Sequence, residues 1–235
     1  MKLSVVVPIY NEEGSVLLLM ESLYANLQNY CYELILVDDG STDATLSIIQ
    51  QNKNEHTRLL ALETNSGQSA ALRAGLAQSK HEIIITLDGD MQNNPKDIHA
   101  LIEQINGSKY SLVQGYRKHR KDGLDKLIPS IVANQLIRFL FSLPVHDIGC
   151  SLKAFRREAI TTFSFFDGFH RYIPLFVHLN GLEVGEIIVG HNVRQAGISK
   201  YGIGRTFSVF KHLLLFRFGN TEKLSNVEYR IKNYF

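Results

Sequence analysis

The sequence predicts an α/β fold in which helices flank a mainly parallel sheet. Through the first half of the chain, short runs rich in β-branched residues alternate with stretches of helical periodicity. The runs are continuously apolar, which is typical of strands that helices cover on both faces. Polar, acidic segments follow three of these strands, at the end of an open α/β sheet where ligands bind.

The predicted elements alternate regularly as far as residue 115. Strands are expected at residues 3–7, 33–37, 58–62, 82–87 and 112–115. The first helix is indicated by apolar residues that recur at spacings of three and four, namely Val16, Leu19, Met20, Leu23 and Leu27. Two later helices should occupy residues 68–77 and 95–105.

After residue 115 the pattern becomes irregular. We expect a helix at 127–141, a turn at 144–149, an extended segment or strand at 151–155, a helix near 171–179 and a strand at 184–189. Apolar residues then recur at helical spacing among basic ones over residues 205–218. This pattern suits a helix lying in a membrane interface, although a core-packing or oligomer-forming helix has the same spacing.

These elements divide the chain into two parts. Residues 1–204 should form the α/β domain, in which regular alternation over residues 1–115 gives way to a less regular half at 116–204. Residues 205–235 should form a C-terminal amphipathic helical extension.

Composition narrows the possible functions. With 235 residues and 45% hydrophobic content, the chain can bury one substantial core. The 25 basic residues barely exceed the 23 acidic ones, so a nucleic-acid partner is not expected. Cys31 and Cys150 lie far apart without metal-binding spacing and are read as reduced thiols. No signal peptide or run approaching the ~18 apolar residues of a spanning helix is evident, which indicates a cytoplasmic protein.

Asp88 and Asp90 directly follow a predicted apolar strand. Because Gly89 permits a tight bend between them, both carboxylates can reach one cation. Hard oxygen ligands of this kind select magnesium or manganese, which can bridge the phosphates of a nucleoside diphosphate. An ordinary Asp-Gly-Asp turn is the alternative interpretation.

Other residues near the strand ends are candidate nucleotide contacts. Asp39 can accept hydrogen bonds from a base or ribose, while Tyr10 can lie near a base and Glu12 near ribose hydroxyls. Pro8 lies at the same strand end, and Gln68 begins a helix whose N-terminus can face the bound nucleoside diphosphate. Turns and helix caps are the simpler interpretation of these segments.

Motifs in a fixed order carry a resemblance to known enzymes. The series VPIYNE, DDGSTD, NxG and DGDxQNxP in the first half resembles the inverting family 2 glycosyltransferases, which have the GT-A fold. The second half is similar to the polyprenyl-phosphate sugar transferases, such as dolichyl-phosphate mannosyltransferase and the undecaprenyl-phosphate glycosyltransferases. That similarity rests on GxR at 115–117, HDIGCSLKAFR at 146–156 and RQAGISKY at 194–201.

The resemblance implies that residues 1–115 form the nucleotide-sugar-binding half and residues 116–204 the acceptor half. It also implies roles for residues that contact the nucleotide sugar, the donor. Asp39 would contact the nucleotide base, and Asp88 and Asp90 would hold Mg²⁺ or Mn²⁺ and the diphosphate. Gln92 would assist at the same metal site.

On the acceptor side, the resemblance implies a set of phosphate-binding groups. Arg117, Lys126 and Ser130 would hold a lipid phosphate, while Arg194 and Lys200 would lie in a loop that closes over both phosphates. Lys126 stands where the family is expected to have arginine, so it offers a point charge in place of a bidentate fork.

The nature of the acceptor decides whether a base is needed. A lipid phosphate is already ionised near neutral pH, so positioning and charge neutralisation suffice for a single inverting displacement. A saccharide hydroxyl would need a general base, and Asp147 is the candidate. Asp147 can equally orient a basic residue or belong to a structural turn.

These observations lead to one leading hypothesis and two alternatives. The chain is expected to transfer a sugar from a UDP- or GDP-linked donor to a polyprenyl phosphate, peripherally at the inner face of the cytoplasmic membrane. A membrane surface or membrane protein would be a partner, and a homo-oligomer is possible. The alternatives are transfer to a saccharide hydroxyl and a non-catalytic nucleotide-sugar-binding protein.

Overall fold

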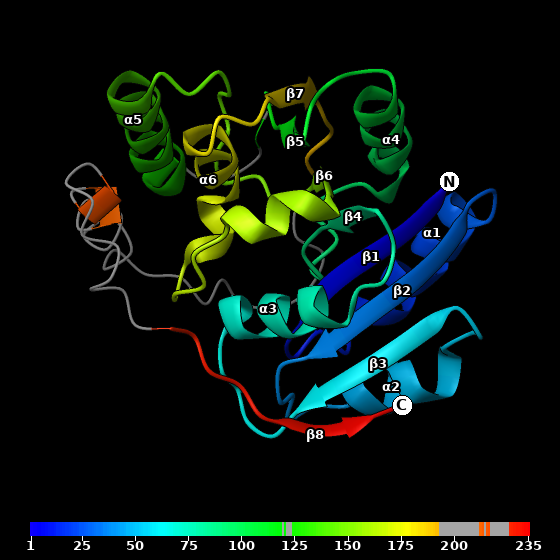
Figure 1. Ribbon diagram of the computed structural model, residues 1–235. Coiled ribbons are helices and arrows are strands. Elements are labelled where there is room, and N and C mark those ends of the chain that lie inside the picture. Colours follow the sequence, from blue (N-terminus) through cyan, green and yellow to red (C-terminus); the bar gives the residue numbers. More distant parts are fainter. Residues whose placement is uncertain (119, 121–123, 193–211, 214, 217–225) are drawn as a thin grey trace.

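One eight-stranded sheet organises the chain (Figure 1). The computed structural model describes residues 1–118, 120, 124–192, 212–213, 215–216 and 226–235. Its strand order is β7-β5-β6-β4-β1-β2-β3-β8. The strands are β1 (Lys2–Ile9), β2 (Cys31–Asp38), β3 (Thr57–Leu62), β4 (Ile83–Thr86), β5 (Leu112–Tyr116), β6 (Lys153–Arg156), β7 (Val184–Ile188) and β8 (Ile231–Tyr234).

Most neighbouring strands run parallel, as the continuous apolar runs predicted. β3, β2, β1 and β4 form a parallel block, and β5 pairs parallel with β7. β6 lies antiparallel between β4 and β5, and β8 lies antiparallel to β3. The segment expected as an extended stretch at 151–155 is therefore a central strand that joins the two parallel blocks.

Helices cover both faces of the sheet. The α-helices are α1 (Val16–Leu27), α2 (Thr45–Asn52), α3 (Gln68–Gln78), α4 (Ile98–Asn106), α5 (Leu124–Phe141) and α6 (Ile173–Leu179), and short 3₁₀ turns include η1 (Pro95–Asp97), η2 (Arg157–Thr162) and η3 (Phe169–Arg171). The buried residues of α1 and α4 pack with Val5 and Val7 of β1, whereas those of α3 and α6 pack in the cluster that contains Val6. Successive strand residues thus face opposite layers, which explains why the strands are apolar throughout.

Helix α3 lies directly on the sheet because a glycine faces it. A Cβ atom on Gly75 would lie only 2.3 Å from Cγ1 of Val6 and 3.0 Å from Cγ2 of Val37. This close approach fixes the axis of α3 over β1 and β2. The N-terminus of α3 consequently lies beside the loops that follow these strands (Figure 1).

The C-terminal segment contains helical residues and a strand. Residues 212–213 and 215–216 are helical, within the stretch where a helix was expected. Ile231–Tyr234 forms β8, which extends the sheet beyond β3. Leu213 and Phe216 are buried in the aromatic core cluster with Phe166, Tyr172 and Phe176. These described parts of the extension therefore pack onto the α/β domain, because strand pairing and aromatic burial both join them to it.

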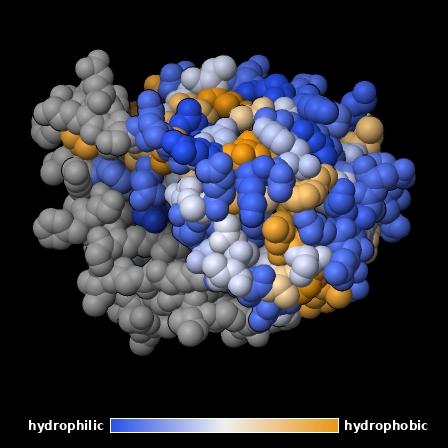
Figure 2. Space-filling model, turned by 90° about the horizontal axis from the view of Figure 1, so that it is seen from below, coloured by the Kyte–Doolittle hydropathy of each residue, from blue (hydrophilic) through white to orange (hydrophobic). Residues whose placement is uncertain are grey.

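The described part of the surface seen from below is predominantly polar and carries smaller apolar patches (Figure 2). Among the described residues, no helix is both long and apolar enough to cross a membrane. Cys31 and Cys150 are both free thiols, as predicted.

Candidate active site

The loops after β1 and β2 are joined by hydrogen bonds. The backbone amide of Asn11 donates to Oγ of Ser41 over 2.9 Å, and the amide of Thr42 donates to Oδ1 of Asn11 over 2.9 Å. Asn11 adopts a positive φ of 52°, which asparagine tolerates better than most residues. The amide of Glu12 donates to Oγ1 of Thr45 over 2.8 Å. These bonds hold the first two polar loops together at one edge of the sheet.

Asp39 anchors a third segment to this edge. Its Oδ1 accepts a hydrogen bond from the amide of Ser66 over 2.8 Å, and its Oδ2 accepts one from the amide of Gly67 over 2.9 Å. The Asp39 side chain is buried, and Gly67 caps the start of α3 with a φ of 91°. The carboxylate predicted to contact a base therefore also fixes the loop that leads into α3.

Tyr10, Glu12 and Pro8 lie at this edge, as expected from their place after or within β1. Glu12 is buried and its Oε2 accepts a hydrogen bond from Oγ of Ser15 over 2.7 Å, which stabilises the start of α1. A Cβ on Gly89 would lie 3.1 Å from the carbonyl oxygen of Pro8. The Asp-Gly-Asp loop therefore rests against the end of β1.

Asp88 and Asp90 form a pair of interacting carboxylates. Burial and the negative charge of Asp90 raise the pKa of Asp88 to about 6. Nε2 of Gln68, the first residue of α3, donates to Oδ1 of Asp88 over 2.6 Å. The backbone amide of Gln92 donates to Oδ1 of Asp90 over 3.1 Å.

This pair fits a hard divalent cation. A cation would relieve the repulsion that disfavours the ionised form of Asp88, and carboxylate oxygens are the ligands that Mg²⁺ and Mn²⁺ prefer. Within the part of the chain that the structure describes, no group of three or more His, Cys, Asp or Glu side chains is placed to hold a metal. Donor phosphates and water would therefore supply the other ligands, as is usual for magnesium at nucleotide sites.

The backbone bends sharply just after the acidic pair, because Met91, between Asp90 and Gln92, has a φ of 61°.

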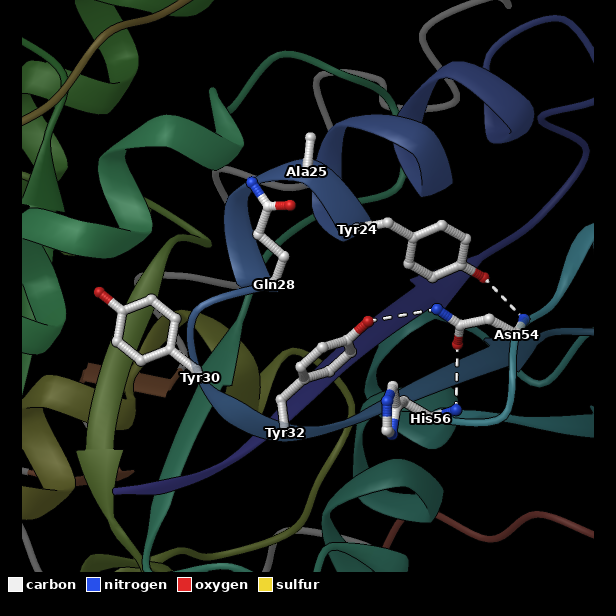
Figure 3. A pocket seen from close by; sticks show the side chains of 7 residues that line it. All are labelled: Tyr24, Ala25, Gln28, Tyr30, Tyr32, Asn54 and His56. Atoms are coloured by element: carbon white, nitrogen blue, oxygen red, sulfur yellow. Dashed lines mark hydrogen bonds between the residues drawn. The ribbon is translucent and has the colours of Figure 1, made fainter.

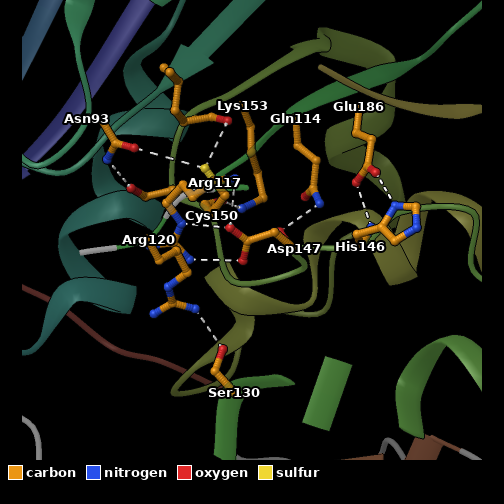
Figure 4. A network of polar contacts seen from close by, with 12 residues as sticks. Asn93, Gln114, Arg117, Arg120, Ser130, His146, Asp147, Cys150, Lys153 and Glu186 are labelled. Carbon is orange, nitrogen blue, oxygen red and sulfur yellow. Dashed lines mark hydrogen bonds and ion pairs between the residues drawn. The ribbon is translucent and has the colours of Figure 1, made fainter. Parts of the chain in front are cut away.

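On the other side of the site, Arg117 and Asp147 form a buried fork (Figure 4). Nε of Arg117 donates to Oδ2 of Asp147 over 2.7 Å and Nη2 donates to Oδ1 over 2.9 Å. The backbone amide of Arg117 adds a third bond to Oδ2 over 3.2 Å. Burial alone would raise the pKa of Asp147, but the hydrogen bonds and charge of Arg117 outweigh it and hold that pKa below its ordinary value.

The fork bears on the role of Asp147. A general base needs proton affinity near the working pH, whereas this carboxylate is held ionised by a bidentate guanidinium. The geometry supports the positioning role for Asp147, in which it orients Arg117.

The remaining acceptor-side predictions fall in different parts of the chain. Ser130 on α5 accepts a hydrogen bond from Nη1 of Arg120 over 2.8 Å. Lys126 lies in the first half of α5, where only the backbone is described. Arg194 and Lys200 lie outside the described residues.

Several residues of the site were not predicted. Asn93 donates through Nδ2 to Oγ of Ser151 over 2.7 Å, and the Ser151 side chain in turn hydrogen-bonds Asp88. Lys153 on β6 is 1% exposed, and Arg120 bonds Ser130. For Lys153 the sequence held a signal, namely a charged residue between apolar Leu152 and the apolar pair Ala154 and Phe155. The other contacts depend on the tertiary structure.

A separate hollow of about 420 Å³ lies at the opposite end of the strands, between the end of α1 and the starts of β2 and β3 (Figure 3). Tyrosine rings form much of its wall, and the hydroxyls of Tyr24 and Tyr32 form hydrogen bonds with other residues of the protein. The hydroxyl of Tyr24 hydrogen-bonds Oγ1 of Thr57 over 2.9 Å, and that of Tyr32 accepts from Nδ2 of Asn54 over 3.2 Å. The acidic pair and the arginine fork identify the loop edge as the candidate active site instead.

Known proteins share this architecture. The chain is similar to the solved structure of glucosyl-3-phosphoglycerate synthase from Mycobacterium tuberculosis, which contains Mn²⁺, UDP-glucose and phosphoglyceric acid. The two structures match with a TM-score of 0.73 at 21% sequence identity. The match covers 93% of this chain and 80% of the other. At this identity the likeness establishes the fold alone, and that fold is GT-A, as the motifs implied.

Sequence comparison is more specific. The chain is 43% identical over 222 residues to dodecaprenyl-phosphate galacturonate synthase from Rhizobium johnstonii. It is 34% identical over 218 residues to undecaprenyl-phosphate 4-deoxy-4-formamido-L-arabinose transferase from Yersinia enterocolitica. Each match covers 91% of this chain and 66% of the relative, so the chain spans just under two thirds of their length.

The family follows from a match across most of the α/β domain. Residues 4–163 match the profile described as glycosyl transferase family 2, and this stretch holds Asp39, Asp88, Asp90, Arg117 and Asp147. The chain therefore belongs to glycosyl transferase family 2.

Proposed function

We propose that the chain transfers a sugar from a nucleoside diphosphate sugar to a polyprenyl phosphate, with inversion and with a divalent cation. The observation that carries this proposal is the pairing of Asp147 with Arg117 on the same sheet edge as Asp88 and Asp90. The fork provides an oriented guanidinium for a second phosphate, and the pKa of its carboxylate, Asp147, is lowered, which does not suit a general base. The names of the two relatives, which act on dodecaprenyl and undecaprenyl phosphate, support the same acceptor class.

Residues in the first half of the chain would bind the donor, the nucleotide sugar. Asp88 and Asp90 would hold Mg²⁺ or Mn²⁺, which when bound neutralises charge on the departing nucleoside diphosphate. Gln68 keeps Asp88 in place through its 2.6 Å bond, and Asp39 holds the loop that precedes Gln68. The names of the relatives do not specify the nucleotide, so a UDP- or GDP-linked donor remains open, and UDP is our first choice.

Acceptor binding falls to Arg117 and its neighbours. One ionised oxygen of the lipid phosphate attacks the anomeric carbon as the bond from that carbon to the nucleotide oxygen breaks, and this single displacement inverts the configuration. No proton has to be removed from the phosphate near neutral pH. Arg117 supplies positive charge in an orientation that Asp147 fixes, and Arg120 and Ser130 extend the polar wall toward α5.

The membrane that contains the acceptor would contact α5. Ile131, Val132, Phe139 and Leu140 of this helix are exposed, and Phe139 is 84% exposed. Ser130 on the same helix bonds Arg120, so Ile131 and Val132 follow directly after a residue of the proposed phosphate site. Phe139 and Leu140 lie further along the same helix. Phe139→Glu should weaken sedimentation with anionic vesicles while leaving nucleotide binding unchanged, and equal sedimentation of both proteins would refute this contact.

The central test uses purified chain, radiolabelled UDP- and GDP-sugars, undecaprenyl phosphate and either Mg²⁺ or Mn²⁺. Label in an organic-soluble product that requires the lipid is the expected result. Label only in water-soluble saccharide would instead support a hydroxyl acceptor. No transfer with any donor, despite measurable binding of nucleotide, would support a non-catalytic binding protein.

A further inference from the structure

Three polar side chains lie in one row across the centre of the sheet. Thr86 of β4 is in register with Lys153 of β6, and Lys153 is in register with Gln114 of β5. Neighbouring residues at the same register point to the same face of a sheet. All three are almost fully buried, with exposed fractions of 4%, 1% and 0%.

Each member of this polar row donates a hydrogen bond to the segment 147–151. Oγ1 of Thr86 donates to the carbonyl of Ser151 over 2.9 Å, and Nε2 of Gln114 donates to the carbonyl of Asp147 over 2.8 Å. Between them, Nζ of Lys153 donates to the carbonyl of Cys150 (Figure 4). The row therefore holds this segment at three points from one side.

The segment connects the two halves of the proposed site. At one end, Asp147 forms the fork with Arg117. At the other end, Ser151 bonds Asn93 and contacts Asp88. Its position consequently affects both the metal-binding carboxylates and the acceptor-side arginine.

Burying the positive charge of a lysine at this position costs free energy, which indicates a role for the charge itself. Lys153 is in register with Thr86, two residues before Asp88, and it bonds Cys150, the neighbour of Ser151, which contacts Asp88. Burial lowers the pKa of Lys153 to about 8, and the charges of Asp147 and Asp88 act to keep it protonated. A threonine or glutamine can satisfy a carbonyl without burying a charge, as the neighbouring positions demonstrate.

We infer that Thr86, Gln114 and Lys153 are positioning residues that set the spacing between the metal carboxylates and Arg117, and that the charge of Lys153 also weakens cation binding at Asp88 and Asp90. This inference rests on the proposed function for its kinetic consequences. The cation-binding part concerns the folded chain alone and can be measured without turnover.

Lys153→Met tests both parts, since it keeps the length of the side chain and removes the charge and the donor. We expect kcat to fall by about 10- to 100-fold, as for other residues that orient site groups, with the KM for the nucleotide sugar close to that of the wild type. Mn²⁺ binding at pH 7, followed by electron paramagnetic resonance in the presence of UDP, should become severalfold tighter. Lys153→Arg should retain the wild-type affinity for Mn²⁺.

Thr86→Val is the matched variant, because it removes one donor without changing charge or volume appreciably. It should lower kcat and leave Mn²⁺ affinity unchanged. Ser4→Ala removes a buried hydroxyl that donates to Glu33 over 2.7 Å, away from the site, and should lower the melting temperature without lowering kcat.

The outcomes separate the two proposals. Unchanged Mn²⁺ affinity in Lys153→Met would overturn the charge role. A wild-type kcat in both Lys153→Met and Thr86→Val, measured where the variants are folded, would overturn the positioning role. If the wild type transfers no sugar to polyprenyl phosphate, the proposed function fails, while the Mn²⁺ measurement still decides the role of Lys153.

Discussion

Asp147→Asn is the substitution that most directly tests the arginine fork. The side chains of Arg117 and Asp147 are 13% and 4% exposed, and two charge-assisted bonds of 2.7 and 2.9 Å join them. Removing one partner of such a pair leaves the other charge buried, which typically costs about 3–5 kcal/mol. Asparagine keeps one acceptor oxygen, so we expect unfolding free energy at pH 7 to fall by about 3 kcal/mol.

The loss should depend on pH in a defined direction. Because the pKa of Asp147 in the folded state is below its ordinary value of 3.8, its contribution to stability is complete above that value. It disappears as the pH falls through the folded-state pKa. Urea unfolding of both proteins should therefore show a difference that is constant near neutral pH and shrinks in acid.

Kinetics distinguish orientation from proton transfer. If Asp147 orients Arg117, the variant should have a lower kcat and a pH–rate profile of unchanged shape between about pH 5 and pH 9. Equal stability of the two proteins at pH 7 would show that the fork does not form. Loss of turnover without loss of stability, together with a lost basic group in the profile, would refute the positioning role.

Three further predictions concern the donor side and its loops. Asp90→Asn should abolish metal-dependent transfer, and retained activity with Mn²⁺ would contradict the proposed ligand set. The half-saturating Mn²⁺ concentration should rise as the pH falls through about 6, where a proton competes for Asp88; an affinity independent of pH from about 5 to 8 would exclude Asp88 as a ligand. Gly40→Ala should lower unfolding free energy by more than about 2 kcal/mol, because φ is 68° and the new Cβ would lie 2.6 Å from the carbonyl carbon of Thr64. Gly181→Ala, at a φ of 76° with open space around it, should cost only about 1 kcal/mol, and equal losses would refute the clash.

Local patterns were sufficient to predict most of the elements. The apolar residues of α1 repeat at helical spacing, and all five that indicated the helix are buried within the observed Val16–Leu27. β8 was missed because Ile231–Tyr234 is a short, largely exposed edge strand. Only pairing with β3 makes it a strand, and no local pattern encodes that partner.

The position of β6 illustrates a second limit. An extended segment was expected near residues 151–155, but its antiparallel insertion between β4 and β5 depends on contacts far along the chain. Without that register, Thr86, Gln114 and Lys153 show no relation to one another. The polar row was therefore inaccessible to sequence reasoning.

By itself, the sequence determined the α/β alternation, the acidic loops and the Asp88 and Asp90 pair, because each is encoded within a few consecutive residues. Tertiary structure alone decided what these residues face. Folding brings Gln68 into a hydrogen bond with Asp88 and Arg117 into hydrogen bonds with Asp147, although the partners are 20 and 30 residues apart in the sequence. A carboxylate becomes a base or a counter-ion according to its burial and its nearest charge, and only folding sets both.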